Sequence, residues 1–108
     1  MYEEFLDGLD AATERKMIRA VERLATHGPP ANPQKCRALR GYTNLWELKE
    51  YQSRVFWFYS LEALSDERKV IVLTHGFTKK RNKTPREQLE RAEALKREYH
   101  TTFLQGSR

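Results

Sequence analysis

A run of five consecutive aromatic and aliphatic residues, Val55–Tyr59, constrains the fold of this chain more than any other feature. Successive side chains of a β-strand point to opposite faces of the sheet, so this segment presents apolar side chains to both faces. A strand of that kind is stable only where both of its faces are covered. The sequence therefore predicts a sheet in which Arg54–Tyr59 occupies a central position.

The segments next to this run also have strand character. Very few residues separate Leu45–Tyr51 from Arg54–Tyr59, which predicts an antiparallel hairpin. In the first arm apolar side chains alternate with Glu47 and Lys49, so these two charged residues fall on the opposite face from the apolar ones. Extended segments are also expected at Cys36–Leu39 and Lys69–Thr74. The Val-Ile-Val-Leu core of the latter favours a central position, and the order of the strands is left open.

Three helices are expected around the sheet, at residues 3–9, at Asp10–His27 and from Thr84 to about His100–Phe103. Apolar residues recur at helical spacing in the second helix, and Gly28 followed by two prolines ends it. The third begins with a hydroxyl N-cap, proline at the first helical position and glutamate at the third, which is a capping box. The predicted class is α+β, with two N-terminal helices packed on a small, mainly antiparallel sheet and a C-terminal helix, in one domain spanning residues 1–108.

Composition excludes several classes of protein. A chain of 108 residues has room for one core. Cys36 is the only cysteine, so no internal disulfide forms and a reducing cytoplasm is the expected location. No signal peptide opens the chain, and its apolar runs are too short to span a membrane. Metal-ligand spacings, a P-loop and a paired-glycine fingerprint are missing, so neither a metal nor a cofactor is expected.

Positive charge gathers in the second part of the chain. The net charge is +5, but residues 1–34 carry −2 and residues 35–108 carry +7, which assigns the basic surface to the second part. The segment Thr74–Pro85 joins one histidine to a cluster of cations between a strand and a capped helix. Its basic residues are His75, Lys79, Lys80, Arg81 and Lys83. An arrangement of this kind suits a phosphodiester, so RNA is the first substrate to consider.

Cleaving RNA without a metal requires a base for the 2′-hydroxyl proton, a cation for the charge on phosphorus and an acid for the departing 5′-oxygen. Histidine serves as acid or base near neutral pH, and arginine meets two phosphate oxygens at once. Ordinary structural roles stay open beside these. A basic run before a helix is often a solvated loop, His75 suits a packed position, and Arg54 can pair with Glu47 or Glu50. Glu47 and Lys49 can equally form an exposed cross-strand charge pattern.

Three motifs in order carry a family resemblance. They are Leu-Trp-Glu-Leu-Lys at Leu45–Lys49, Arg-Val-Phe-Trp-Phe-Tyr at Arg54–Tyr59, and a histidine-glycine-phenylalanine segment that leads through a lysine pair to Lys-Thr-Pro at Lys83–Pro85. In this order they resemble the RelE/ParE toxin superfamily, and more narrowly its HigB-like, phage-derived branch of type II toxin–antitoxin systems. The resemblance covers most of the chain.

The resemblance implies a ribosome-dependent mRNA endoribonuclease that cleaves by 2′-hydroxyl attack without a metal and so inhibits translation. Its implied partners are the ribosome, mRNA and a HigA-like, helix-turn-helix antitoxin that alone contacts operator DNA. On this sequence Arg54 becomes the transition-state stabiliser, Lys79 or Lys80 the phosphate ligand or proton donor, and His75 an acid or base. RNA-binding roles are expected for Arg37, Arg40, Lys49, Arg81 and Lys83.

Two other functions stay open. The superfamily also contains ParE-like inhibitors of DNA gyrase, and a degenerate toxin would act only as a module that binds antitoxin or nucleic acid. Members of the superfamily usually start with a strand before the helix pair, whereas Met1 here falls almost directly on helical sequence. That first strand is therefore expected to be short or missing, which leaves a sheet edge for an antitoxin segment or a second copy to cover. The antitoxin is expected to cover the basic face or displace the last helix.

Overall fold

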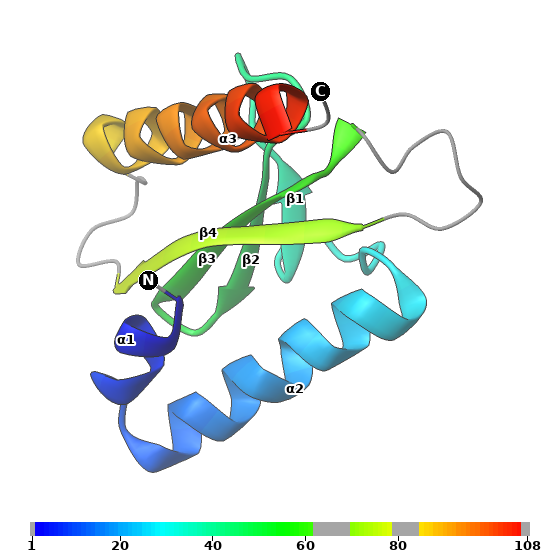
Figure 1. The fold of residues 1–108 in the computed structure, drawn as a ribbon. Helices are drawn as coiled ribbons and strands as arrows, with labels where there is room; N and C mark the ends of the chain where they lie inside the picture. Colours follow the sequence, from blue (N-terminus) through cyan, green and yellow to red (C-terminus); the bar gives the residue numbers. More distant parts are fainter. Residues whose placement is uncertain (1, 62–69, 79–84, 107–108) are drawn as a thin grey trace.

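The computed structural model describes residues 2–61, 70–78 and 85–106, with side chains as far as residue 102. Its elements in chain order are α1 (Tyr2–Asp7), α2 (Ala11–His27), β1 (Cys36–Ala38), β2 (Trp46–Glu50), β3 (Ser53–Tyr59), β4 (Ile71–Thr78) and α3 (Arg86–Gly106). The strands form one antiparallel sheet in the order β1-β2-β3-β4. In Figure 1, α1 and α2 lie below this sheet and α3 lies above it. The predicted α+β class is confirmed.

Two apolar clusters hold these layers together, one on each face of β3. Trp57 and Val55 belong to the cluster shared with α1 and α2. Phe56 and Phe58 belong to the cluster shared with α3. All four side chains are buried, so the alternation of the strand places apolar groups in both clusters, as the sequence predicted. Burial of this extent contributes roughly 1.5–3 kcal/mol for each large apolar side chain.

The hairpin is confirmed, and its pairing is tight. Trp46 faces Trp57 across the two strands, and the chain turns after Glu50 pairs with Ser53. The two indole rings stack with centroids 4.7 Å apart and planes 13° from parallel. Cross-strand aromatic pairs of this type stabilise a sheet beyond the area they bury. This hairpin fixes the position of every charged side chain on β2 and β3.

The central position predicted for Lys69–Thr74 is wrong among the described strands, because β4 lies at one edge of the sheet. The helices that cover both faces of β4 account for the apolar character of this strand. Ile71 and Leu73 pack against the cluster of α1 and α2, whereas Val72 packs against the cluster of α3. An edge strand that is covered on both faces needs the same two-sided apolar pattern as a central one. Within the described residues no strand precedes α1, which begins at Tyr2.

β4 also continues to Thr78, four residues beyond its predicted end, and carries a bulge. Trp57 pairs with Leu73 and Val55 pairs with Gly76, so Thr74 and His75 together face the single residue Phe56. A bulge of this kind shifts the alternation of the strand by one residue. His75 consequently faces α3, whereas an unbroken strand would turn it towards α1.

The helix boundaries follow their caps. The Asp10 side chain accepts a hydrogen bond from the Thr13 backbone N–H at the start of α2. Gly28 ends α2 with a φ of 78°, a conformation that favours glycine. The first helix is shorter than predicted and ends at Asp7, and α3 is longer than predicted and reaches Gly106. The carbonyl of Pro85 accepts the first hydrogen bonds of α3, while Thr84, the predicted N-cap, lies outside the described residues.

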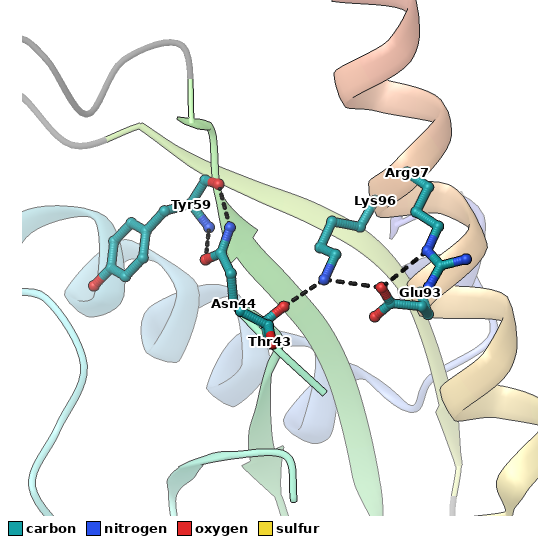
Figure 2. A network of polar contacts seen from close by, with 6 residues as sticks. All are labelled: Thr43, Asn44, Tyr59, Glu93, Lys96 and Arg97. Carbon is teal, nitrogen blue, oxygen red and sulfur yellow. Dashed lines mark hydrogen bonds and ion pairs between the residues drawn. The ribbon is translucent and has the colours of Figure 1, made fainter. Parts of the chain in front are cut away.

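Polar contacts fasten α3 and the β2 side of the sheet to each other, as Figure 2 shows. Buried Lys96 donates to the carbonyl oxygen of Thr43 and lies 3.0 Å from Glu93, which also pairs with Arg97 at 3.3 Å. The neighbouring Asn44 uses its amide group twice. It donates to the carbonyl of Tyr59 at 2.8 Å and accepts from the Tyr59 N–H at 3.0 Å. The end of β3 is thereby held against the loop that leads into β2.

Asn44 combines these hydrogen bonds with a φ of 55°, so two substitutions separate its two contributions. Asn44→Gly keeps the backbone conformation and loses both hydrogen bonds, which we expect to lower the free energy of unfolding by about 1–2 kcal/mol. Asn44→Ala keeps the Cβ atom that asparagine has but lacks the amide group that makes the left-handed region tolerable, so it should cost about 1 kcal/mol more than the glycine variant. Urea denaturation measures both. Equal stabilities of the two variants would contradict the conformational part.

Gly76 allows α1 to dock on β4. A Cβ atom at this position would lie 2.3 Å from the Phe5 ring and 2.5 Å from Cγ at its base. Because Cγ is fixed close to the backbone of α1, rotating the ring does not relieve the clash. The glycine therefore sets the distance between α1 and the sheet.

Gly76→Ala should lower the free energy of unfolding by about 1–3 kcal/mol, because the new methyl group overpacks the contact with Phe5. The matched control is Gly8→Ala, where the added Cβ meets its nearest atom at an ordinary 3.5 Å. Chemical denaturation compares the two. In a protein that already carries Phe5→Ala, Gly76→Ala should change the free energy of unfolding very little. If the losses of the two single variants instead add in full in the double variant, this contact is excluded as the cause.

Candidate functional site

The sheet face that looks towards α3 carries two neighbouring rows of candidate residues. One row crosses the sheet as Arg37, Glu47, Phe56 and His75, and the next as Lys49, Arg54 and Phe77. The structure therefore brings three predicted site residues, Arg37, Arg54 and His75, to one face, while Lys49, at the end of the second row, also lines a cavity on the α2 side of the sheet. Arg54 and His75 occupy diagonal corners of the patch that they form with the two phenylalanines.

The other predicted residues are not part of these rows. Arg40 is exposed and lies after the end of β1. Lys79, Lys80, Arg81 and Lys83 lie outside the described residues. The described strand β4 ends at Thr78, so the chain enters this basic segment directly from the strand that carries His75. Their predicted roles stay predictions.

Glu47 is the residue of this face that the sequence pattern did not single out. Its side chain is fully buried, so the exposed charge pattern considered for Glu47 and Lys49 is wrong for Glu47. Its Oε1 atom lies 3.4 Å from Nε of Arg54 and 3.8 Å from Nε of Arg37. The pairing of Arg54 with Glu47 is thus confirmed. A buried carboxylate between two guanidinium groups fixes both of them and neutralises part of their charge.

Arg54 is held by the protein on several sides. Besides the ion pair with Glu47, its Nη1 atom donates to the carbonyl oxygens of Tyr51 and Ser53 at the hairpin turn. The residue is 8% exposed. Burial lowers the pKa of Arg54, with Arg37 acting in the same direction and Glu47 opposing them. Arginine remains charged despite such a shift. The site therefore contains a fixed positive charge that is mostly covered by protein.

His75 is the titratable group at the centre of the site, and it is 2% exposed. Its Nε2 atom lies 2.8 Å from Oε1 of Gln88 on α3, and its Nδ1 atom lies 3.4 Å from Oγ1 of Thr74. An amide oxygen accepts, so this pairing assigns the proton to Nε2 and leaves Nδ1 as an acceptor. Burial lowers the pKa of His75, Gln88 opposes this, and Arg91 adds to it. The imidazole is therefore neutral at pH 7.

A comparison with known protein families identifies the family of this chain. The model of the family described as phage-derived protein Gp49-like (DUF891) matches residues 4–97, from α1 through most of α3. The chain belongs to this family. It is a toxin-like family of the toxin–antitoxin type, which confirms the expected class at that level and points to an antitoxin as a partner. No curated protein matches the chain.

In the described part of this Gp49-like protein, no group of three or more His, Cys, Asp or Glu side chains is placed to hold a metal ion. None of its helices combines the length and apolar character needed to cross a bilayer. The α3-facing site itself offers a neutral imidazole, a fixed guanidinium and a half-exposed Arg37, whose side chain is 47% accessible. These groups suit proton transfer beside a bound anion.

The lowered pKa of His75 predicts a pH-dependent stability. Below about pH 6.5 the unfolded chain binds a proton that the native Gp49-like protein does not bind, so the free energy of unfolding should fall from pH 7.5 to pH 5.5. His75→Gln removes this titration and should flatten the curve over that interval. Urea denaturation at several pH values measures the slopes. The matched control, His27→Gln, changes an exposed histidine and should keep the slope of the parent protein. An unchanged slope in His75→Gln would refute the assignment of the pH dependence to His75.

Proposed function

We propose that this Gp49-like protein is the toxin of a type II toxin–antitoxin system, and that it is a ribosome-dependent endoribonuclease of the RelE/HigB-like kind. The observation that carries the proposal is the neutral His75 on the same sheet face as Arg37 and Arg54, directly before the basic segment 79–84. The family supports the toxin class, and the residues on this face support the reaction.

The proposed reaction needs no metal. The 2′-oxygen of one nucleotide attacks the adjacent phosphorus, the bond from phosphorus to the 5′-oxygen breaks, and a 2′,3′-cyclic phosphate and a 5′-hydroxyl result. His75 in its neutral form accepts the 2′-proton. One of Lys79 and Lys80 donates the proton that the leaving 5′-oxygen takes up, and the other holds the phosphate. Arg54 and Arg37 supply positive charge for the negative charge that accumulates on phosphorus.

Burial of His75 supports the requirement for a ribosome. The Gln88 side chain occupies Nε2, and the histidine has almost no contact with solvent. A substrate reaches the imidazole only when the first turn of α3 gives way or its contact with Gln88 is replaced. We propose that the ribosome supplies the binding energy for this change by positioning mRNA against the site. A free toxin then cleaves RNA poorly.

Inducing the chain in a bacterial host and mapping mRNA 5′ ends within minutes tests the activity. Growth arrest with new, codon-phased 5′ ends inside translated regions is expected. His75→Gln, and separately Lys79→Ala combined with Lys80→Ala, should reduce these ends by about 10²-fold or more. Arg15→Gln serves as a control because Arg15 is exposed on α2 and lies outside the site.

Arg54 requires a compensated variant, because removing it alone leaves the buried carboxylate of Glu47 without its nearer arginine. Glu47→Gln combined with Arg54→Met removes both charges and retains volume, which avoids most of the loss of stability. Loss of cleavage in this folded variant supports the role of Arg54. Full cleavage in it excludes that role. Arrest with intact mRNA would favour gyrase inhibition over cleavage.

A non-catalytic module that binds its antitoxin is the second candidate, and the contacts of Arg54 favour it. Its ion pair with Glu47 and its hydrogen bonds to two carbonyl groups are those of a residue that stabilises a hairpin. Normal growth after induction, with a folded protein that binds a HigA-like antitoxin, would establish this candidate. The antitoxin in turn would carry the contact with operator DNA.

A further inference from the structure

A second basic surface lies on the other side of the sheet, in a cavity of about 560 Å³ between α2, the residues that follow it and the end of β2. One carboxylate, Glu50, is among the residues that line it. The basic residues in the lining are Lys16, Arg19, Arg23, His27, Lys35 and Lys49. We refer to this cavity as the α2 groove. It belongs to the opposite face from His75, because its floor includes Leu24 and Leu48 of the cluster shared with α2.

The cations of α2 form one stripe along the groove. Lys16, Arg19, Arg23 and His27 follow one another at intervals of three and four residues, which places them on one side of the helix. At 1.5 Å per residue this stripe is about 16 Å long. A basic surface is therefore present on residues 1–34 as well, in addition to the one predicted for residues 35–108. The net charge of residues 1–34 is negative because it adds acidic residues outside the groove lining, among them Glu22, which lines a neighbouring pocket with Arg19 and Arg23.

The remaining contacts indicate which partner the α2 groove suits. The lining of the groove exposes more apolar than polar surface, although Leu24 and Leu48 themselves are buried, so the choice of partner rests on its charge. Glu50 is paired with Lys35 at 3.3 Å. Arg19 and Arg23 are exposed, and neither takes part in an ion pair within the described part of the chain. The uncompensated charge of the groove is thus positive, as a polyanion requires.

An aromatic side chain stands beside the stripe of α2. Tyr51 at the hairpin turn is 65% exposed, and Lys16 donates a hydrogen bond to its hydroxyl group. The ammonium of Lys16 lies 4.3 Å from the centre of the Tyr51 ring, which fixes the ring next to the groove. A cationic groove together with an exposed aromatic ring is typical of single-stranded nucleic acid binding, in which bases stack on the ring.

We propose that the α2 groove binds the phosphate backbone of single-stranded RNA, with one base stacked on Tyr51. The choice of RNA rests on the proposed nuclease function. Because the groove and His75 lie on opposite faces of the sheet, it holds a part of the RNA that is not cleaved. Arg19 and Arg23 contact phosphates, and Lys16 positions Tyr51.

The test measures binding of a 2′-O-methyl RNA of about 12 nucleotides by fluorescence anisotropy, between about 50 and 200 mM salt. This probe lacks the attacking hydroxyl group, so the full chain binds it without cleaving it. Arg19→Gln combined with Arg23→Gln removes two phosphate contacts. It should reduce the slope of log K against log salt by about 1.4, which is about 0.7 for each contact with a single strand. Tyr51→Leu should weaken binding by about tenfold and keep the slope.

Arg86→Gln combined with Arg97→Gln is the matched control, because it removes the same charge from exposed positions on α3, outside the groove. It should keep the slope of the parent protein. Equal reductions in both double variants, or none in the groove variant, would overturn the proposal. So would a groove variant that binds RNA normally but loses affinity for a glutamate-rich peptide, since the groove would then suit a protein. A toxin that cleaves no mRNA still gives the expected slopes, so the two proposals fail separately.

Discussion

Coverage of the sheet on both faces is the constraint on which the rest of this structure depends. With α1 and α2 on one face and α3 on the other, almost every side chain of β3 is buried, whichever way it points. Polar groups buried between these layers then need protein partners, because leaving a buried charge or hydrogen-bonding group unpaired costs several kcal/mol. Glu47 finds two arginines, His75 finds Gln88, and Lys96 finds a carbonyl oxygen and Glu93. The candidate site is thus assembled by the same burial that stabilises the fold.

Burial also sets the chemistry of the site. Loss of water keeps His75 neutral, as a proton acceptor must be, and it strengthens the attraction between Glu47 and the arginines. The same burial hides the imidazole beneath Gln88. A geometry that is fixed before the substrate arrives avoids the cost of ordering it during the reaction, but here access depends on movement of α3. An antitoxin that holds α3 in place would block the site without touching His75.

Patterns that depend on local sequence predicted most of the fold. The two-sided apolar run identified β3, the short gap before it identified the hairpin, and the glycine–proline stop identified the end of α2. Features that depend on pairing between distant segments were not accessible in this way. The bulge at Thr74 and His75 arises from the register against Phe56, and it decides which helix the histidine meets. The burial of Glu47 likewise depends on what covers its face. The stripe on α2 could be read from the intervals of three and four residues between its basic residues. Only the fold, however, places Lys35 and Lys49 opposite that stripe.

The two basic surfaces differ in how their charges are held, and this difference would separate their contributions to the proposed recognition of RNA. On the α3 side the guanidinium of Arg54 is fixed by a buried carboxylate and by carbonyl groups, so it contributes position more than long-range attraction. In the α2 groove Arg19 and Arg23 are exposed, and salt screens exposed charges strongly. Affinity for RNA should therefore depend steeply on ionic strength through the groove, whereas the geometry around His75 should change little with salt. Capture of RNA and its cleavage are, on this view, the tasks of opposite faces of one sheet.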